Sequence, residues 1–331
     1  MARYLVTGGC GFIGAHLVAR LLREGHAVRV LDDLSTGSPE NLPPPARRDL
    51  VVGDVADRDV VRRCMTDVDG CFHLAAVASV ARCTEDWLGA HRVNLTGSIQ
   101  VFDAAKLRLT PVVYASSAAV YGDNPDLPLA EDAAPRPLSA YAADKLGAES
   151  HARAAAHVHG LSTVALRFFN VYGPGQDPRS PYAGVISLFA DRLRLGLPLD
   201  LHGDGGQVRD FVHVADVATF LLAAMRRASC PDAGAATYNV CTGRPTTVRD
   251  LAATLADLAG REPEFRERPV RAGDVRRSLG DPSLAERDLG CRATTTLWEG
   301  LRGTLAALNP AAGRTTSARQ ARGASEAAAG R

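Results

Sequence analysis

The stretch Thr7-Gly8-Gly9-Cys10-Gly11-Phe12-Ile13-Gly14 decides the fold predicted for this chain. It lies between a short apolar run, 3–7, which predicts a strand, and an amphipathic segment, 15–25, which predicts a helix. Glycine at 8, 11 and 14 permits a tight turn, lets a pyrophosphate approach the backbone and allows close packing of helix on strand. Phosphate groups bind well at the amino end of a helix. The stretch therefore predicts the first β–α unit of a dinucleotide-binding domain.

An acidic pair marks the end of the next predicted strand. Asp32 and Asp33 follow the strand at 27–31, and Asp32 comes 24 residues after Gly8. An acid at this place accepts hydrogen bonds from an adenosine ribose, and its charge repels a 2′-phosphate. The sequence therefore favours NAD over NADP.

Strands and helices then alternate along the chain. We predict strands at 50–53, 71–74, 111–115 and 162–168, and helices at 58–65, 87–107 and 141–159. This alternation indicates an α/β fold with a Rossmann-type, doubly wound parallel sheet. In such sheets ligands bind beyond the carboxyl ends of the strands. The residues expected to converge on that crevice are Gly8, Asp32, Asp54, Ala75, Ser117 and Phe168.

Tyr141 and Lys145 are four residues apart in a predicted helix, so both side chains lie on one helix face. A free phenol titrates near pH ~10 and is a poor base at neutral pH. A cation about 4 Å away would favour the phenolate by roughly 4 kcal/mol at an effective dielectric of ~20, or about 3 pKa units. The spacing therefore predicts that Lys145 lowers the pKa of Tyr141 and makes it a usable acid or base.

Composition limits the classes of protein to which the chain can belong. It has 331 residues, 46% hydrophobic and 23% charged, with a formal net charge of +1, which gives no reason to expect nucleic acid or a membrane surface as partner. No apolar run reaches the ~18 residues of a membrane span, and no signal-peptide pattern opens the chain. The seven scattered cysteines form no C-x-x-C pair and indicate reduced thiols in the cytoplasm. No metal site is expected, because His157 and His159 face different sides of a helix.

As a set, the motifs resemble those of the extended short-chain dehydrogenase/reductase family, and within it the NAD-dependent nucleotide-sugar epimerases of the UDP-glucose 4-epimerase type. The resemblance covers residues 1–305. The motifs are, in chain order, Thr7-Gly8-Gly9-x-Gly11-Phe12-Ile13-Gly14, Asp32-Asp33, Asp54-Val55, His73-Leu74-Ala75-Ala76, Asn94, Ser116-Ser117-x-x-Val120-Tyr121-Gly122, Tyr141-x-x-x-Lys145, Arg167-Phe168-Phe169-Asn170-Val171-Tyr172-Gly173-Pro174, Gln207-x-Arg209-Asp210-Phe211 and Gly273-Asp274.

The resemblance implies C4 epimerisation of a nucleotide-diphosphate hexose through a transient 4-keto sugar and a reversible hydride transfer. Ser117, Tyr141 and Lys145 would be the catalytic residues. NAD would be held by Gly8, Gly11, Phe12, Ile13, Gly14, Asp32, Asp33, Asp54, Val55, Leu74, Ala75, Ala76, Asn94, Tyr141, Lys145 and Phe168. The substrate would be held by Ser117, Tyr141, Asn170, Arg209, Arg271, Asp274 and Ser278, where the two arginines are candidate diphosphate clamps.

The same resemblance predicts how the chain is divided. Residues 1–170, with a returning segment at about 210–242, would form the NAD-binding domain. Residues 171–209 and 243–308 would form a smaller, C-terminal substrate-binding domain. Residues 309–331 are almost without large apolar side chains, which predicts a disordered tail. The helices at 87–107 and 141–159 would pair across a two-fold axis in a homodimer.

Related chemistries must be distinguished at the two positions after Ser117. Nucleotide-sugar 4,6-dehydratases have an Asp-Glu pair there and glucuronate decarboxylases a glutamate in the same region, whereas this chain has Ala118 and Ala119. Methyl groups transfer no protons, so simple epimerisation is preferred. Dehydratase, decarboxylase and UDP-glucuronate 4-epimerase activities remain alternatives, and Cys83 or Glu85 could carry unusual chemistry.

The sugar and the base stay open at this stage. In the epimerases that this chain resembles, a bulky residue at the position of Ser278 goes with restriction to plain hexoses. Serine is small, which favours room for an N-acetyl group on the sugar. A carboxylate at C6 would need a donor such as Arg82 or Arg179. The sequence does not distinguish uracil from thymine. A non-catalytic NAD-binding sensor is the alternative of another class, and it is disfavoured because the chain keeps Ser117, Tyr141 and Lys145.

Overall fold

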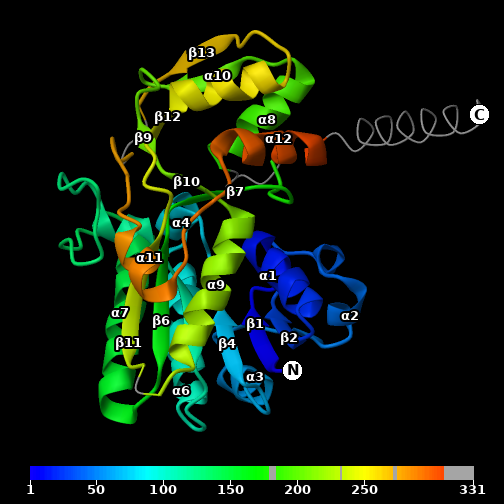
Figure 1. Cartoon of the computed structure of the whole chain (residues 1–331), viewed down its shortest axis with the longest axis vertical. Coiled ribbons are helices and arrows are strands. Elements are labelled where there is room, and N and C mark those ends of the chain that lie inside the picture. The colour runs from blue at the N-terminus through cyan, green and yellow to red at the C-terminus, as the bar shows by residue number, and fades with distance from the viewer. Residues whose placement is uncertain (179–183, 232, 271–273, 309–331) are drawn as a thin grey trace, which may run out of the picture.

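The computed structural model describes residues 1–178, 184–231, 233–270 and 274–308. Its centre is a sheet of seven parallel strands in the order β11-β6-β5-β4-β1-β2-β3 (Figure 1). The chain winds outward from β1 in both directions, so the predicted doubly wound Rossmann-type sheet is confirmed. The strands are β1 (Arg3–Thr7), β2 (Ala27–Asp32), β3 (Leu50–Val52), β4 (Gly70–His73), β5 (Val112–Ser117), β6 (Thr163–Phe168) and β11 (Ala235–Val240).

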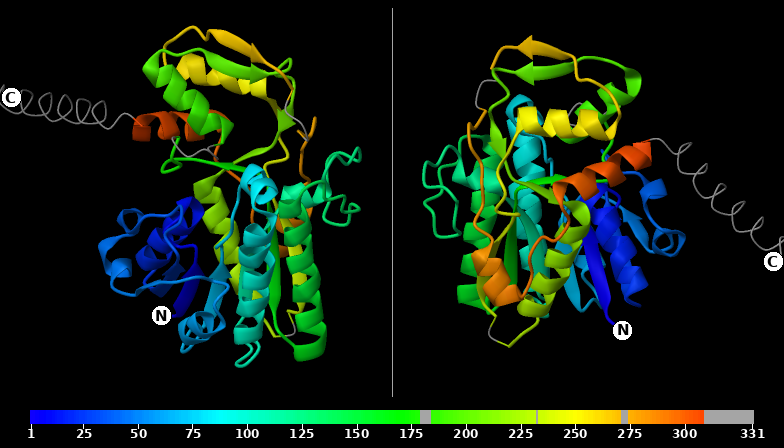
Figure 2. Two further views of the ribbon diagram at one scale, coloured as in Figure 1. Left: turned by 180° about the vertical axis from the view of Figure 1, so that it is seen from behind. Right: turned by 45° about the horizontal axis from the view of Figure 1, so that its top comes forward.

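Helices cover both faces of this sheet. One face packs against α1 (Phe12–Arg23) and α9 (Val214–Ala228), and the other against α3 (Arg58–Cys64), α6 (Gly97–Ala105) and α7 (Ala140–His159), seen from behind in Figure 2 (left). In α1, for example, Leu17, Val18 and Leu21 lie on one helical face and are fully buried. The apolar periodicity of the sequence thus decides which side of each helix meets the sheet.

The long helix predicted over 87–107 is interrupted. It consists of α5 (Trp87–His91), the π-helical segment η2 (Arg92–Thr96) and α6. Single π-turns inside α-helices are uncommon and are frequent at functional sites. The preceding short helix, α4 (Val80–Glu85), follows the loop after β4.

Helix α7 has well-defined ends. The Ser139 side chain accepts a hydrogen bond from the backbone N–H of Ala142, which is a standard N-cap. At the other end Gly160 adopts a left-handed conformation with φ of 68°, which terminates the helix. These ends fix the helix that carries Tyr141 and Lys145.

A second layer lies beyond the carboxyl ends of the sheet strands, at the top of Figure 1. It has its own apolar core, built from α8 (Val185–Leu195), α10 (Val248–Leu258), α12 (Leu297–Leu308) and the parallel pair β8 (Leu199–His202) and β13 (Phe265–Arg268). Two short pairs connect the layers: β7 (Asn170–Tyr172) with β10 (Phe211–His213), and β9 (Val208–Arg209) with β12 (Thr246–Thr247).

The remaining short elements are η1 (Pro39–Asn41), α2 (Pro44–Arg47), η3 (Ala118–Tyr121) and α11 (Ser283–Leu289). Helix α11 returns to the large sheet, where it packs against β11 and α9. Among the described residues, no helix combines the length and apolar character needed to cross a membrane.

Candidate active site

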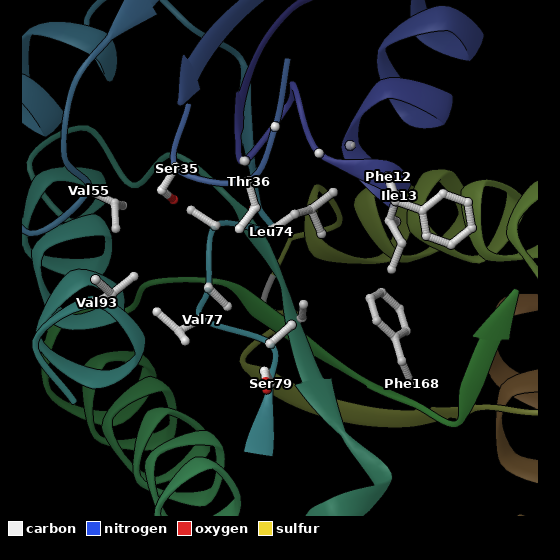
Figure 3. A pocket seen from close by; sticks show the side chains of 18 of the residues that line it. Phe12, Ile13, Ser35, Thr36, Val55, Leu74, Val77, Ser79, Val93 and Phe168 are labelled. Atoms are coloured by element: carbon white, nitrogen blue, oxygen red, sulfur yellow. The ribbon is translucent and has the colours of Figure 1, made fainter. Parts of the chain in front are cut away.

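A cavity of about 480 Å³ opens at the carboxyl ends of the central strands. Figure 3 shows Phe12, Ile13 and Phe168 on one side of this cavity and Val55 and Val93 on the other. Its size suits a small-molecule or cofactor site. Predicted site residues that line it are Gly8, Gly11, Phe12, Ile13, Gly14, Asp32, Asp33, Asp54, Val55, Leu74, Ala75, Ala76, Ser117, Tyr141, Lys145, Phe168 and Asn170.

The glycine turn needs its glycines for steric reasons. Gly8 has a φ of +68°, and a Cβ on it would lie 2.7 Å from the backbone nitrogen of Ala75. A Cβ on Gly14 would lie 2.1 Å from the carbonyl oxygen of Gly8. Because no side chain fits at either position, the turn packs against the loop after β4 and leaves the amino end of α1 facing the cavity.

The acids at the end of β2 differ in their surroundings. Asp32 is 7% exposed, and its two carboxylate oxygens accept hydrogen bonds from the backbone N–H groups of Cys10 (2.8 Å) and Leu34 (2.9 Å). Burial raises the pKa of Asp32, and those backbone bonds oppose the rise. Asp33 is exposed at the cavity edge. Asp32 thus fixes the turn, whereas the exposed Asp33 accepts hydrogen bonds from the Ser35 N–H (2.9 Å) and the Ser35 hydroxyl (2.7 Å).

Asp54 closes the same end of the cavity. Its carboxylate accepts a hydrogen bond from the Ala56 N–H (2.8 Å) and forms an ion pair with Arg92 of η2 (2.8 Å). The π-helical segment is therefore tied to the cavity wall.

Asn94 does not line the cavity; it lies behind the wall. Its buried side chain accepts a hydrogen bond from the backbone N–H of Val77 (2.8 Å) and donates one to the carbonyl oxygen of the same residue (3.2 Å). Sequence reasoning assigned Asn94 to the cofactor directly. The structure instead shows it holding Val77, which does line the cavity.

A chain of buried hydrogen bonds supports the other end of this wall. Thr7 Oγ1 accepts from the N–H groups of Leu74 and Ala75 (both 3.2 Å) and lies 2.8 Å from His73 Nδ1. His73 Nε2 lies 3.0 Å from Ser98 Oγ. Since the Ser98 hydroxyl donates to the Asn94 carbonyl (2.6 Å), we assign the proton of His73 to Nε2 and let Nδ1 accept from Thr7. Burial lowers the pKa of His73 to about 3, which keeps it neutral.

Ser117, Tyr141 and Lys145 meet where β5 ends against α7. The Tyr141 hydroxyl is hydrogen-bonded to Ser117. The Lys145 ammonium donates to the carbonyl oxygen of Ala115 (2.8 Å) and lies 5.8 Å from the centroid of the Tyr141 ring. The predicted trio is therefore assembled on one side of the cavity.

The pKa of Tyr141 differs from the sequence prediction. In the chain alone its pKa is raised, because burial of the phenol outweighs the hydrogen bond with Ser117 that lowers it. Burial also lowers the pKa of Lys145 to about 8, against the opposing effect of Asp144. Lys145 is directed to a carbonyl group and not to the phenol oxygen, so the expected lowering of the Tyr141 pKa by Lys145 was wrong.

The predicted substrate residues fall into two groups. Asn170 lines the cavity beside the catalytic trio, whereas Arg209, Asp274 and Ser278 lie away from it, on β9 and the segment alongside. Arg209 Nη2 and Asp274 Oδ1 form an ion pair at 2.5 Å, and the Ser278 N–H donates to the Val208 carbonyl at 3.0 Å. Arg271, like Arg179, lies outside the described residues.

Several lining residues were not predicted. They include Ser35, Thr36, Val77, Ser79, Val93 and Gln176. Arg82, which the sequence offered as a donor for a C6 carboxylate, also lines the cavity. Ser35 and Thr36 directly follow the acidic pair, and in the sequence only this position after β2 could have indicated that they line the cavity. Of the two unusual candidates, Cys83 is fully buried with its thiol against the Val77 carbonyl (3.4 Å), and Glu85 is exposed; neither lines the cavity.

The fold and the cavity define a dinucleotide-binding α/β protein with a serine, tyrosine and lysine at the site. Residues 4–241 match the model of the NAD dependent epimerase/dehydratase family, and the chain belongs to that family.

Individual relatives agree along nearly the whole chain. It is 39% identical to a UDP-glucose 4-epimerase of Mycolicibacterium smegmatis, over 92% of this chain and 97% of the relative. The structure of Thermus thermophilus UDP-glucose 4-epimerase in complex with NAD is similar, with a TM-score of 0.83, 39% identity and coverage of 92% and 97% of the two chains. MoeE5 in complex with UDP-glucuronic acid and NAD gives a TM-score of 0.83 and 36% identity, and covers 93% and 99%.

Proposed function

We propose that the chain catalyses NAD-dependent C4 epimerisation of a nucleotide-diphosphate hexose. The observation that carries this proposal is the meeting of Ser117, Tyr141 and Lys145 at one side of a cavity formed by a dinucleotide-binding turn. Among the described residues that line this cavity, the carboxylates are Asp32, Asp33 and Asp54, all at the ends of β2 and β3. None follows Ser117, so removal of a C5 proton has no obvious base.

The residues of the cavity suit NAD. The glycine turn offers backbone where a side chain would not fit, and Asp33 offers an exposed acceptor to a ribose. The uncharged wall at 74–77 lies close to that turn. When bound, NAD supplies a reversible hydride acceptor.

The protein's own residues move and hold the proton. Burial favours the neutral phenol of Tyr141, and the positive charge of bound NAD+ would favour its phenolate. The phenolate would take the proton of the sugar hydroxyl, and the phenol would return it. Ser117 Oγ accepts a hydrogen bond from the Ala119 N–H (3.1 Å), which fixes its orientation toward Tyr141. The Lys145 ammonium lies 5.8 Å from the centroid of the Tyr141 ring, so its positive charge is close to the phenol.

The nucleotide end of the substrate is assigned to the second layer. Arg209 is half-buried and paired with Asp274, so its guanidinium is held in place for phosphate oxygens. Asp274 then serves the nucleotide ribose. Ser278, which does not line the cavity, stays a candidate for contact with the sugar. Arg271 stays a second candidate clamp.

The test is a product analysis of purified protein without added NAD. UDP-glucose, UDP-GlcNAc, UDP-glucuronate and dTDP-glucose are incubated separately, and the products are resolved by chromatography and NMR. We expect an equilibrating pair of C4 epimers. A product that has lost water or carbon dioxide would replace this proposal with a dehydratase or a decarboxylase, and NAD binding without turnover would favour a sensor.

A uronic acid substrate is the second candidate, and Arg82 favours it. Arg82 lines the cavity near the loop after β4 and forms no ion pair with any residue that the structure describes. A guanidinium in that position suits a carboxylate at C6. Arg82→Gln should then raise KM for UDP-glucuronate about 10-fold or more and leave KM for UDP-glucose unchanged, since a charge-assisted hydrogen bond is worth ~1.5–3 kcal/mol. Equal effects on both sugars would exclude this specificity.

We further propose a cytoplasmic homodimer. Trp87 and Leu88 of α5 are 64% and 83% exposed, and α5 lies beside α7. Apolar exposure of this kind supports a pairing surface on these helices. Leu88→Glu should reduce the mass measured by light scattering from two chains to one; a wild-type mass of one chain would reject the dimer.

A further inference from the structure

Helix α7 is docked on the end of β5 through three successive turns of one face. Tyr141, Lys145 and Glu149 are spaced by four residues and so lie one above another. Tyr141 is hydrogen-bonded to Ser117, Lys145 donates to the Ala115 carbonyl, and Glu149 accepts a hydrogen bond from the Ser116 hydroxyl (2.5 Å). The first two contacts belong to the catalytic site, while the third belongs to no function assigned so far.

The third contact is rigid and charged. Glu149 is 1% exposed, and both of its oxygens are held by Arg167, from Nε to Oε1 at 2.9 Å and from Nη2 to Oε2 at 2.7 Å. A two-pronged arginine–carboxylate pair has a fixed geometry, which a single hydrogen bond lacks. Arg167 and Ser116 are register partners on the adjacent strands β6 and β5, so both reach Glu149 from the sheet.

Arg167 is itself braced from the opposite side. Its Nη1 donates to the Tyr121 hydroxyl (2.8 Å) and to the Glu131 carbonyl (2.9 Å), and its guanidinium lies 4.7 Å from the centroid of the Tyr121 ring. The Tyr121 hydroxyl in turn donates to the Asn239 side chain on β11 (2.7 Å). Three strands of the sheet thus fix the position of one carboxylate on α7.

We propose that Glu149, braced by Arg167, is a positioning residue that sets the rotation of α7 against β5 through Ser116 and thereby aligns Tyr141 with Ser117. The inference rests on the proposed function, because it assigns a role in that reaction. Glu149 itself stays two helical turns away from Tyr141 and does not line the cavity.

Geometry shows why such a fixed point matters. A rotation of α7 by about 10° would move an atom at the ~6 Å outer radius of the helix by roughly 1 Å. A misplacement of that size in a proton-transfer pair costs up to ~100-fold in rate. Substrate and cofactor binding depend on many other groups, so the effect falls on kcat and not on KM.

Ser116 also lines the cavity, but its hydroxyl is bonded to Glu149. Ser116→Ala is therefore the decisive variant, because it removes the link to β5 and leaves the Glu149–Arg167 pair intact. We expect kcat to fall about 10-fold, with KM for the sugar and the dissociation constant of NAD unchanged. Ser150→Ala is the matched control: it deletes a hydroxyl from the outer face of the same helix, where Ser150 bonds only to the Leu146 carbonyl and Arg153. It should keep wild-type kcat. If Ser116→Ala lowers the melting temperature and leaves kcat unchanged, the role is structural and the proposal is wrong.

A second variant tests the brace itself. Replacing both ions, Glu149→Leu with Arg167→Met, leaves no buried charge unpaired, and such replacements often preserve folding. We expect a folded protein that binds NAD normally and turns over at least 10-fold more slowly; a wild-type kcat would overturn the proposal. If wild-type protein epimerises none of the sugars, the proposed function fails. If it is active and these variants are equally active, only the present inference fails.

Discussion

At the scale of single residues, the proposed reaction depends on Tyr141 and on its contact with Ser117. Burial raises the pKa of the phenol and the hydrogen bond with Ser117 lowers it, so the two effects oppose each other within the same small volume. The positive charge of Lys145 sits 5.8 Å from the ring centroid. Removal of the phenol oxygen should therefore abolish proton transfer without disturbing the cavity.

Tyr141→Phe tests this assignment. We expect kcat to fall by about 10³-fold, within the ~10²–10⁴ range of general acid–base catalysis, with NAD binding unchanged by calorimetry. Tyr238→Phe is the control, since it removes a buried phenol oxygen from β11, outside the cavity. Activity retained in Tyr141→Phe would remove the proton-transfer mechanism.

His73 gives a pH-dependent prediction of stability. Its folded-state pKa of about 3 lies below the unfolded value of 6.5, so the unfolded chain binds the extra proton first as the pH falls. The stabilisation is complete above pH 6.5 and is lost progressively toward pH 3. Between pH 6.5 and 5 the loss should be roughly 1.6 kcal/mol.

Urea unfolding of wild type and His73→Gln at both pH values measures this contribution. The free energy of unfolding should depend less on pH in the variant, because the variant lacks the imidazole of His73. The other titrating groups contribute equally to both proteins and cancel when the two are compared. Identical pH dependence in the two proteins would show that folding does not lower the pKa of His73.

At the scale of elements, the π-helical segment and the loop after β4 act together. Asn94 holds both the N–H and the carbonyl of Val77, while Thr7 holds the N–H groups of Leu74 and Ala75. The wall at 74–77 is therefore fixed at both ends by side chains that do not line the cavity, Thr7 of β1 and Asn94 of η2. Cofactor affinity should depend on these indirect contacts.

Asn94→Ala should weaken NAD binding about 10-fold, as measured by calorimetry. Without Asn94 the wall at 74–77 is less ordered and must be ordered again when NAD binds. The two hydrogen bonds lost to Val77 amount to ~1–3 kcal/mol. Asn124→Ala is the matched control. The Asn124 side chain also holds loop backbone, because it donates to the Ala134 carbonyl and accepts from the Asp126 N–H, but it does not line the cavity. An unchanged NAD affinity in Asn94→Ala would mean that the wall holds without Asn94.

At the scale of the whole molecule, the reaction needs the two layers to act on one substrate. The large sheet supplies the catalytic trio and the dinucleotide turn. In the proposed function, the second layer supplies Arg209, Asp274 and Ser278, which do not line the cavity. The division of the chain at 170 and 242 stays a prediction, because independent folding of the parts is a property that only proteolysis and unfolding experiments measure.

Arg209→Gln tests the contribution of the second layer. We expect KM for the nucleotide sugar to rise about 10-fold or more, with the dissociation constant of NAD unchanged, because a charge-assisted bond to phosphate is worth ~1.5–3 kcal/mol. Arg266→Gln removes an exposed arginine of the same layer, paired with Asp200, and should leave KM as it is. Equal KM values in wild type and Arg209→Gln would reject the clamp.

Much of the site was predictable because its requirements are local. Gly8 and Gly14 are dictated by a turn with no space for side chains, and Asp32 by its place after a strand. Parallel strands end on one edge of a sheet, so the sequence alone predicts that residues such as Ala75 and Ser117 lie close together.

What the sequence determined by itself was therefore the sheet, its glycine turn and the set of residues at its carboxyl edge, since backbone sterics and apolar periodicity act between near neighbours. Only the tertiary structure decided that Asn94 stands behind the wall, that Arg82 enters the cavity and that Glu149 meets Ser116 and Arg167. It also reversed the expected pKa shift of Tyr141. Burial and hydrogen-bond partners depend on residues far apart in the chain, and these contacts exist only when the chain is packed.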